Sequence, residues 1–451
     1  MVLPAPLPTW QESPSRKIKV AVSDIDGVLR GKFLHIDKFR SIANSTFGFC
    51  SVILGWDSWD QLYDNSQYTG WHTGYPDAAV AVDLSTYRQI PWHDNIPFFL
   101  GDFVDSKGAG LEVCPRQALK RVIAKAAAMG FSSKVGCEFE WFNFQESGAS
   151  MAQKGFVNPT PLTPGMFGYS LLRMSQNHDF FTAIMEHMDR FRVPIEGLHP
   201  ETGPGVYEAA ILYSDALEAA DRAILFKSGV KEIASQFGIL ASFMAKWNMA
   251  LPGCSGHIHQ SLWDSKGNPV FFSGNDPHSM SPLFKNYVAG VLHCLPDILA
   301  LCAPTVNSYK RLVEGFWAPT RATWGIDNRT CALRVIPASA AATRLEFRVP
   351  GADMNPYLAV AATLAAGLYG IENELPLLDA PVSGNGYENK TSAAFPKNLH
   401  EAATRFKESK IAHALFPEAF VQHFAESRLW EWRQSQQAVT DWELKRYFEI
   451  I

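Results

Sequence analysis

Acidic and imidazole side chains recur at every second position in apolar segments that are typical of β-strands. The segment VGCEFEWFNF carries Glu138 and Glu140, and the segment GCSGHIHQSL carries His257 and His259. Because successive strand residues point to opposite faces, each pair shares one face, with its members about 6.5–7 Å apart. Two carboxylates on one face repel each other unless a cation lies between them. Taken singly, each segment also fits a strand whose polar face is in water.

Two further segments carry the same kind of chemistry. IEGLHPETGPGVYEAA places glutamates around a turn rich in glycine and proline, and ATRLEFRVPG alternates arginine with glutamate. The residues concerned are Glu196, Glu201, Glu208, Arg344, Glu346 and Arg348. A solvated acidic turn and a structural ion-pair ladder are the ordinary explanations of these segments. Upstream of the ladder lie Arg311, Arg329 and Arg334, and arginine is suited to two-pronged binding of carboxylates and phosphates.

Together the four segments predict a polar interior that needs metal ions and anionic ligands to neutralise it. Oxygen ligands with an imidazole suit Mg²⁺ or Mn²⁺ better than zinc. Carboxylates, divalent metals and arginines in one site indicate phosphoryl transfer from a nucleotide. The sequence contains no G-x-x-x-x-G-K-[ST] motif, which excludes a P-loop enzyme.

Length, charge and cysteine content limit the class of protein. The 451 residues suit two domains, and a net charge of −5 offers no basic field for a nucleic acid. The apolar stretch from Asn355 to Ile371 predicts a buried helix rather than a membrane span. The N-terminus lacks the apolar core of a signal peptide. The seven cysteines form no C-x-x-C pair, which favours reduced thiols and a cytoplasmic protein with no membrane partner.

Strands and helices are predicted from apolar periodicity and from the residues that begin and end helices. Residues 1–16, with four prolines, are expected to be a flexible lead-in. KIKVAVSDIDGVLRGKFLHIDKF predicts two strands around a turn at Asp26 and Gly27, within a small sheet-rich domain. Helices are expected over 115–129 and over 215–237, the second with Asp215 as N-cap. The C-terminal tail predicts further amphipathic helices.

At these residues the sequence resembles the glutamine synthetase family, from about Lys19 to Ile451. The motifs that carry the resemblance are SDIDGVLRGK, CEFEWF, HPETGPGVYE, GCSGHIHQSL, PTVNSYKRL and RLEFRVPGADMNPYLA. The resemblance implies an α+β protein with an N-terminal β-grasp domain over 17–107 and a C-terminal catalytic α/β domain over 108–451. It also implies a ring-shaped homo-oligomer, expected to be a dodecamer, with active sites between neighbouring subunits.

The resemblance also implies a role for each motif residue. The metal on the glutamate side is expected to be bound by Glu140, Glu201 and Glu208, and the metal on the ATP phosphates by Glu138, His257 and Glu346. The substrate carboxylates are expected to be bound by Gly253, Arg311 and Arg348, and the transferring phosphoryl group to be stabilised by Arg329 and Arg334. The expected nucleotide contacts are Glu196, Tyr213, His259, Ser261 and Arg344.

The implied reaction is ATP-dependent amide formation. A carboxylate is a poor acyl donor, so ATP converts the γ-carboxylate of glutamate into an acyl phosphate. Two or more Mg²⁺ or Mn²⁺ ions per site hold both anions in line, and the arginines offset charge on the transferring group. A nitrogen nucleophile then displaces phosphate.

One position departs from the pattern of ammonia-using members of the family. They carry a glutamate on the flap after N-S-Y-K-R-L, just before Ala-Pro, where this chain has Trp317, and the nearest carboxylate is Glu314. The other ammonium-site residue of the family, an aspartate of the N-terminal domain, matches Asp57, with Asp60 as the alternative. An indole cannot take up a proton, but it can line a pocket for an apolar amine.

These residues favour a ligase that joins glutamate to a hydrophobic monoamine. An alkylamine is protonated at pH 7 and needs a base, whereas an arylamine is neutral, so loss of the flap glutamate favours an aniline-like substrate. The first alternative is glutamine synthetase itself, with Glu314 or Asp57 covering for the missing glutamate. The second is a non-catalytic structural relative, against which the complete set of candidate metal ligands argues.

Overall fold

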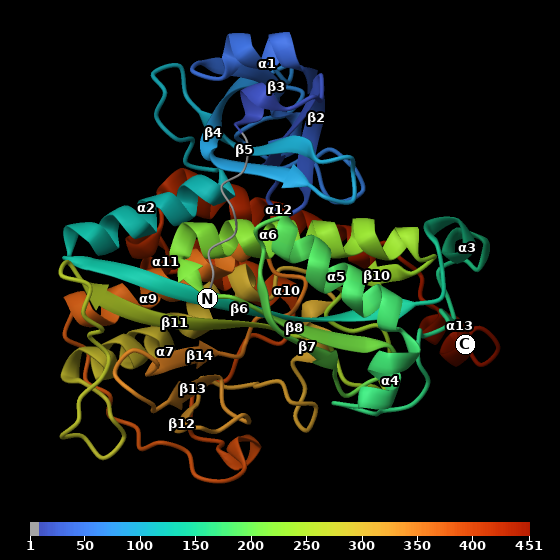
Figure 1. Ribbon diagram of the computed structural model, residues 1–451. Helices are drawn as coiled ribbons and strands as arrows, with labels where there is room; N and C mark the ends of the chain where they lie inside the picture. Colours follow the sequence, from blue (N-terminus) through green and yellow to red (C-terminus); the bar gives the residue numbers. More distant parts are fainter. Residues whose placement is uncertain (1–8) are drawn as a thin grey trace.

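The computed structural model describes residues 9–451, and Figure 1 shows an N-terminal sheet domain standing on a larger domain of helices packed on a long sheet. The first eight residues of the expected lead-in lie outside the described residues. Directly after them, Trp10–Glu12 form a 3-10 helix (η1), and the Trp10 ring packs edge-on against Phe39 with 4.9 Å between ring centroids. This part of the expected lead-in is therefore held on the N-terminal domain, because the indole contacts its core.

Five strands form the N-terminal sheet in the order β2-β1-β5-β4-β3. They are β1 (Lys17–Ser23), β2 (Leu29–His35), β3 (Thr46–Cys50), β4 (Asp77–Ile90) and β5 (Ile96–Val104), with α1 (Ile36–Ile42) and the 3-10 helix η2 (Ser51–Leu54) between strands. β1 and β2 are the expected antiparallel pair. Their turn requires Gly27, because its φ is +76° and an added Cβ would lie 3.0 Å from the Cα of Asn355.

The larger domain is built on a nine-stranded sheet whose main path is β12-β13-β14-β11-β6-β8-β7, with β9 and β10 also paired to β6. The strands are β6 (Phe131–Phe144), β7 (Ile195–Pro200), β8 (Val206–Ile211), β9 (Ser214–Asp215), β10 (Leu240–Ser242), β11 (Gly256–Asp264), β12 (Trp324–Ile326), β13 (Leu333–Ile336) and β14 (Arg344–Phe347). The four segments predicted from alternation to be strands are thus neighbours in one sheet.

Both helices predicted from their end signals are present, as α2 (Pro115–Ala128) and α6 (Ala216–Gln236). Asp215 precedes α6 but makes no capping hydrogen bond, because its carboxylate instead accepts from Lys134 at 2.7 Å. The other helices are α3 (Gly148–Gln153), α4 (Leu171–Gln176), α5 (His178–Arg190), α7 (Pro282–Cys302), α8 (Ser308–Arg311), α9 (Pro356–Glu372), η3 (Gly386–Glu388), α10 (Leu399–Glu408), α11 (Lys410–Leu415), α12 (Glu418–Gln436) and α13 (Asp441–Tyr447).

One face of β6 packs against helices, and this decides which side chains remain for chemistry. Figure 1 shows α2 and α6 between the long sheet and the N-terminal domain. Trp141 of β6 lies against Phe226 of α6, with 5.5 Å between ring centroids. The predicted buried helix is α9, which is covered on nearly all sides. Within residues 9–451, no helix combines the length and the apolar character that crossing a membrane requires.

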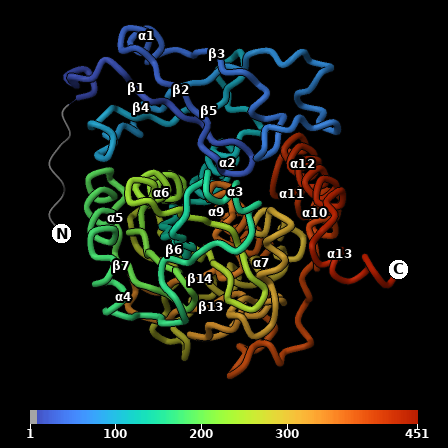
Figure 2. Tube along the Cα trace, turned by 90° about the vertical axis from the view of Figure 1, so that its right-hand side faces the viewer, coloured from blue at the N-terminus to red at the C-terminus, as the bar shows by residue number. Residues whose placement is uncertain are grey.

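The C-terminal helices connect the two domains on the side shown in Figure 2, where α12 reaches from the larger domain to the N-terminal one. The indole Nε1 of Trp430 donates to Asp57 of the N-terminal domain at 2.9 Å. Arg428, which is buried, donates to Asp26 at 2.5 Å and to the carbonyl of Pro304 at 2.7 Å. Side chains of one helix therefore bind both domains.

A buried arginine joins the N-terminal sheet to the helices beneath it. Arg116 of α2 donates two hydrogen bonds of 2.8 Å to Asp221 of α6, one of 2.8 Å to Asp102 of β5 and one of 3.0 Å to Asp83 of β4. Tyr357 also donates to Asp221, at 2.7 Å. One guanidinium thus neutralises carboxylates from three elements and both domains.

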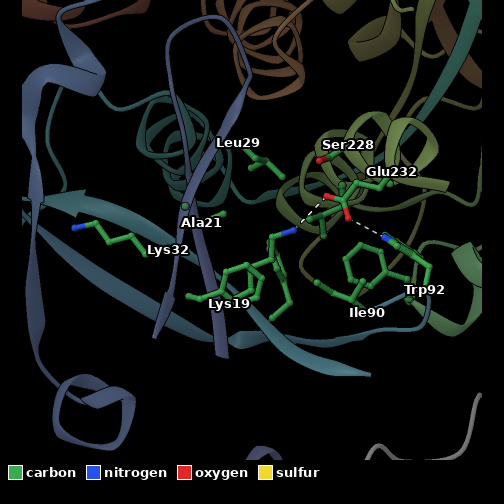
Figure 3. A pocket seen from close by; sticks show the side chains of 14 residues that line it. Lys19, Ala21, Leu29, Lys32, Ile90, Trp92, Ser228 and Glu232 are labelled. Carbon is green, nitrogen blue, oxygen red and sulfur yellow. Dashed lines mark hydrogen bonds and ion pairs between the residues drawn. The ribbon is translucent and has the colours of Figure 1, made fainter. Parts of the chain in front are cut away.

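A second polar contact between the domains lies at the edge of a cavity of about 140 Å³ (Figure 3). Glu232 of α6 accepts from Lys19 of β1 at 3.2 Å and from the indole of Trp92 at 2.8 Å. The same glutamate therefore holds two segments of the N-terminal domain against α6.

We expect Arg116→Met to destabilise the protein by about 3–5 kcal/mol, because it leaves the buried Asp221 without its cation, although Lys120 stays 2.5 Å from Asp102. The free energy of unfolding in a denaturant titration measures this change. Arg16→Met is the control, since the Arg16 side chain is exposed, with an ion pair to Asp37 at 3.6 Å and a hydrogen bond to His35 at 3.3 Å, and we expect a change within about 0.5 kcal/mol. A loss below about 1 kcal/mol in Arg116→Met would show that the network contributes little to stability.

Candidate active site

The polar face of β6 opposes the polar faces of its neighbours, residue by residue. Glu138 lies opposite His257 of β11, and Glu140 lies opposite Glu208 of β8. His259 of β11 in turn faces Glu346 of β14. Directly opposite residues have Cβ atoms about 4.5–5.5 Å apart, so the predicted side chains from four strands converge on one surface.

The first cluster contains the ligands expected for the metal on the ATP phosphates. His257 Nδ1 lies 3.3 Å from Glu138 Oε1 and 3.4 Å from Glu346 Oε1. The other ring nitrogen of His257 is buried and has no hydrogen-bond partner among residues 9–451. His259, expected as a nucleotide contact, is also near, with its Nε2 3.6 Å from Glu138 Oε2. The donor atoms of Glu138, His259 and Glu346 all lie within 4.8 Å of one another.

The second cluster contains the ligands expected for the metal on the glutamate side, and a histidine that sequence reasoning missed. His199 lies opposite Glu208, and its Nε2 is 3.3 Å from Glu201 Oε2 and 3.7 Å from Glu208 Oε1. Its ring stacks on Tyr169 with 4.3 Å between centroids. The signal was the H-x-E spacing of His199 and Glu201, the same period of two that revealed the other clusters. The donor atoms of His199, Glu201 and Glu208 lie within 4.8 Å of one another. Glu140 lies opposite Glu208 but outside this group, and its Oε2 accepts from the Ser255 N–H at 2.5 Å.

The two clusters differ in how their charges are balanced. Burial, together with Glu138, Glu140 and Glu201, raises the pKa of Glu208 to about 11. Burial also acts on Glu346, but His257 and Arg348 outweigh it and lower the pKa of that carboxyl to about 2. In the glutamate-side cluster the positive neighbour is His199, which lowers the pKa of Glu201 against the effect of burial, whereas the other cluster also has arginine neighbours. Buried carboxylate oxygens with an imidazole nitrogen free to bind fit Mg²⁺ or Mn²⁺.

All five residues expected to contact the nucleotide line one cavity of about 440 Å³ beside the first cluster. They are Glu196, Tyr213, His259, Ser261 and Arg344. Arg344 donates to His259 Nδ1 at 3.2 Å, which couples the cavity to the metal ligands. Trp263, which sequence reasoning missed, lines the same cavity and donates from Nε1 to Ser261 Oγ at 3.0 Å. An indole that directly follows the H-x-H-x-S pattern at period two was the available signal.

The arginines expected to bind substrate anions take up different environments. Arg311 is 2% exposed and donates to the Val349 carbonyl and to Ser255 Oγ, both at 2.9 Å. Burial lowers the pKa of its guanidinium, and Glu140 and Asp353 oppose that effect. Gly253 gives Arg311 its space, because a Cβ there would lie 2.9 Å from Arg311 Cγ.

Two of the other three arginines, Arg334 and Arg348, are paired with Glu346. Arg348 donates to Glu346 Oε1 at 2.5 Å, and Arg334 donates to Glu346 Oε2 at 2.8 Å. Arg329 is exposed, and its carbonyl accepts from Arg348 at 3.1 Å. Arg334 and Arg348 can bind a further anion only with the N–H donors that these ion pairs leave free.

The residues that bear on the choice of amine lie apart from the clusters within one chain. Trp317 is 57% exposed on the flap, and its φ of +59° is unusual for a bulky residue. Glu314 is paired with Lys390 at 2.6 Å. The Asp57 carboxylate accepts from the backbone of Trp59 and Gln61 and from Trp430. Asp60, the alternative to Asp57, is paired with Arg30 at 2.9 Å.

The raised pKa of Glu208 predicts that metal binding tightens as pH rises. Because burial and neighbouring carboxylates raise the pKa from 4.5 to about 11, the metal-free folded state keeps a proton that the unfolded state loses, and stability falls as pH rises between these values. A divalent cation must displace that proton. The rise in melting temperature caused by Mg²⁺ should therefore be larger at about pH 9 than at about pH 7.

Glu208→Gln is the matched variant for this measurement. It should raise the melting temperature of the metal-free protein at the higher pH, since it removes the crowded carboxylate while keeping its size. It should also reduce the effect of Mg²⁺ at both pH values. Equal Mg²⁺ effects at the two pH values in the unsubstituted protein would contradict the assignment of Glu208 as a ligand.

Comparison with known proteins agrees with this chemistry. The model for the glutamine synthetase catalytic domain matches residues 112–447. Type-1 glutamine synthetase 2 of Dictyostelium discoideum is 54% identical over 97% of this chain and 85% of its own length. Glutamate–isopropylamine ligase of Pseudomonas sp is 40% identical over 96% of this chain and 95% of its own. A solved structure described as a GmaS/ADP complex superposes with a TM-score of 0.84 at 29% identity, over 97% of this chain and 98% of that one.

The matched region contains both carboxylate clusters, the nucleotide-sized cavity and the buried arginines. Members of this family are ligases that use ATP and divalent metal ions. On the strength of the extent of the match and the identity to its relatives, this chain belongs to the glutamine synthetase family.

Proposed function

We propose that this protein is an ATP-dependent ligase that joins the γ-carboxylate of glutamate to a hydrophobic monoamine, alkyl or aromatic, through a γ-glutamyl phosphate. The observation that carries the proposal is the flap. Its indole, Trp317, stands 57% exposed where ammonia-using relatives are expected to carry a carboxylate. Apolar surface at this point favours an amine that brings apolar surface of its own. The relative from Pseudomonas, whose name states isopropylamine as substrate, supports the same direction.

In this proposal each group of site residues binds a different part of the substrates or metals. Arg311 and Arg348 bind the carboxylates of glutamate, and Arg329 and Arg334 stabilise the transferring phosphoryl group. Glu196, Tyr213, His259, Ser261 and Arg344, which line one cavity, bind ATP. Two or more Mg²⁺ or Mn²⁺ ions, held by Glu138, His257 and Glu346 and by Glu140, Glu201 and Glu208, would neutralise the phosphates and the γ-carboxylate.

The proton on the amine gives a reason to favour an aniline-like substrate. An arylamine is already neutral at pH 7, whereas an alkylamine must lose a proton first. Glu314 is a poor replacement for the absent base, since it is exposed and paired with Lys390 at 2.6 Å. Asp57 could act only from another copy of the chain, because within one chain it lies on the N-terminal domain against α12, apart from the metal clusters. The proposal therefore includes a ring-shaped homo-oligomer, expected to be a dodecamer, in which a neighbour's loop approaches this site.

A second candidate is glutamine synthetase itself. The relative from Dictyostelium discoideum carries that name and is 54% identical to this chain. The two candidates share every step up to the acyl phosphate and differ in the nucleophile. A phosphate-release assay with glutamate, ATP and a panel of ammonia, ethanolamine, putrescine, isopropylamine and aniline separates them. Ammonia as the best nucleophile would favour glutamine synthetase, and no phosphate release with any amine would favour a non-catalytic relative.

Glu140→Ala and Glu346→Ala should each abolish amide formation, because each removes a ligand from a different metal. Both variants should fold. Glu140→Ala relieves repulsion with Glu208, which lies opposite it, whereas Glu346→Ala should lower the free energy of unfolding, because it leaves Arg348 without its carboxylate. Phosphate release at saturating Mg²⁺ and circular dichroism provide the two measurements. A variant that kept more than about a tenth of the unsubstituted turnover would show that its ligand assignment is wrong.

Trp317→Glu should raise the specificity constant for ammonia and lower it for an apolar amine. The new carboxylate binds a cation and brings water to the pocket, and the lost indole contact is worth about 1–3 kcal/mol if the amine is largely buried. Trp317→Ala is the matched control, which should lose the apolar amine without gaining ammonia. Free amine and free ammonia concentrations must be computed at one fixed pH. A ratio of the two specificity constants within about twofold of the unsubstituted enzyme would place the amine pocket elsewhere.

A further inference from the structure

Lys246 is a buried cation that lacks a hydrogen-bond partner. It lies in the segment between β10 and β11, its side chain is 2% exposed, and its Nζ has no partner among residues 9–451. Burial lowers the pKa of its ammonium, and the positive charge of Arg311 lowers it further. A methionine would fill similar space without the desolvation cost of a charge. Burial of the Lys246 ammonium therefore calls for a favourable contact that a methionine could not make.

The group that faces this ammonium is the ring of Phe316 on the flap. Lys246 Nζ lies 4.1 Å from the ring centroid, within the range of a cation–π interaction. Such an interaction is stronger when both partners are shielded from water. Phe316 is half-buried, and its neighbour Trp317 is 57% exposed.

The backbone of Lys246 is itself fixed to the base of the flap. The side-chain amide of Asn307 accepts from the Lys246 N–H and donates to the Lys246 carbonyl, both at 2.8 Å. Asn307 directly precedes α8, which ends at the buried Arg311. The ammonium therefore has a defined place relative to the segment from which the flap extends.

The flap residues 313–319 turn sharply on either side of Phe316. Gly315 has a φ of +84° and Trp317 a φ of +59°, and the second value is costly for a residue with a large side chain. A strained conformation persists only when its surroundings hold it. Among the contacts that hold this one are the ion pair of Glu314 with Lys390 on the surface and the contact of Phe316 with Lys246 inside.

We propose that Lys246 is a positioning residue for amine selection, which holds the flap through the face of Phe316 and thereby sets Trp317 at the amine position. The inference rests on the proposed function in one respect, that Trp317 contacts the amine. Lys246 does not touch the reacting atoms. It acts by fixing one side of a turn whose other side presents the indole.

Lys246→Met tests the role of the charge, since methionine keeps length and apolar contact with the ring. We expect KM for the preferred amine to rise about fivefold, with KM for glutamate and ATP changed less than about twofold. Backbone amides of residues 313–319 should exchange with deuterium faster than in the unsubstituted protein, and the melting temperature should not fall. Lys246→Arg, which keeps a cation for the ring, should restore both amine KM and amide protection.

Phe316→Leu removes the aromatic face from the other partner and should reproduce both effects. The double variant Lys246→Met/Phe316→Leu should then be no worse than either single variant, because both remove one contact. Effects that add in full would overturn the proposal. So would a rise in KM for glutamate without one for the amine, which would make Lys246 a binder of the acid substrate.

Amide exchange keeps this inference separable from the proposed function. If ammonia were the only nucleophile accepted, the proposed amine preference would fail, yet exchange in residues 313–319 would still decide whether Lys246 holds the flap. Unchanged exchange in Lys246→Met would overturn the inference even if the amine preference were correct.

Discussion

Glu208 is repelled by Glu138 and Glu140 on the same face of the large sheet and by Glu201 just after β7, and this repulsion is the constraint on which the rest of the site depends. Antiparallel pairing places Glu140 opposite Glu208, so the register itself brings like charges together. Burial makes this costly, and it raises the pKa of Glu208 to about 11. A site with this electrostatic character is suited to bind divalent cations and the phosphates that accompany them.

Apolar packing on the opposite face of the same strands offsets the cost of burying these carboxylates. Trp141 and its apolar neighbours pack against α6, so β6 is held by one side while the other remains free for chemistry. The helices beneath the N-terminal domain are joined to it by Arg116, whose guanidinium binds carboxylates from both domains. At this joint a guanidinium neutralises the carboxylates within the chain. In the glutamate-side cluster the carboxylates lie beside an imidazole, His199, instead. This difference separates a structural ion-pair network from a ligand site.

The flap combines two aromatic side chains with opposite exposures. Phe316 points to the interior, where Lys246 lies 4.1 Å from its ring centroid, and Trp317 points outward. The left-handed backbone at Trp317 separates them. An exposed indole held in a strained turn is well suited to contact an apolar group, and it lacks the proton acceptor that a cationic amine requires. On the proposed function, the amine preference of this protein would depend on this short loop rather than on the metal clusters or the nucleotide cavity.

The sequence by itself determined which residues share a face within a strand. A period of two suffices for Glu138 with Glu140, and for His257 with His259, because strand geometry is local. It could not supply the partners across the sheet, since the register of distant strands depends on tertiary packing. The H-x-E spacing could have linked His199 to Glu201, but the position of His199 opposite Glu208 depends on that register.

The tertiary structure also decided roles that residue types leave open. Asp57 carries the carboxylate expected for the amine site, but within one chain that carboxylate binds Trp430. Glu314 was a candidate replacement for the flap glutamate, but it is paired with Lys390. Lys246 gave no signal in the sequence at all, because burial of a charge against an aromatic face arises only when segments from different parts of the chain meet. Alternation along a strand can be read from neighbouring residues, whereas the surroundings of a charge depend on the whole fold.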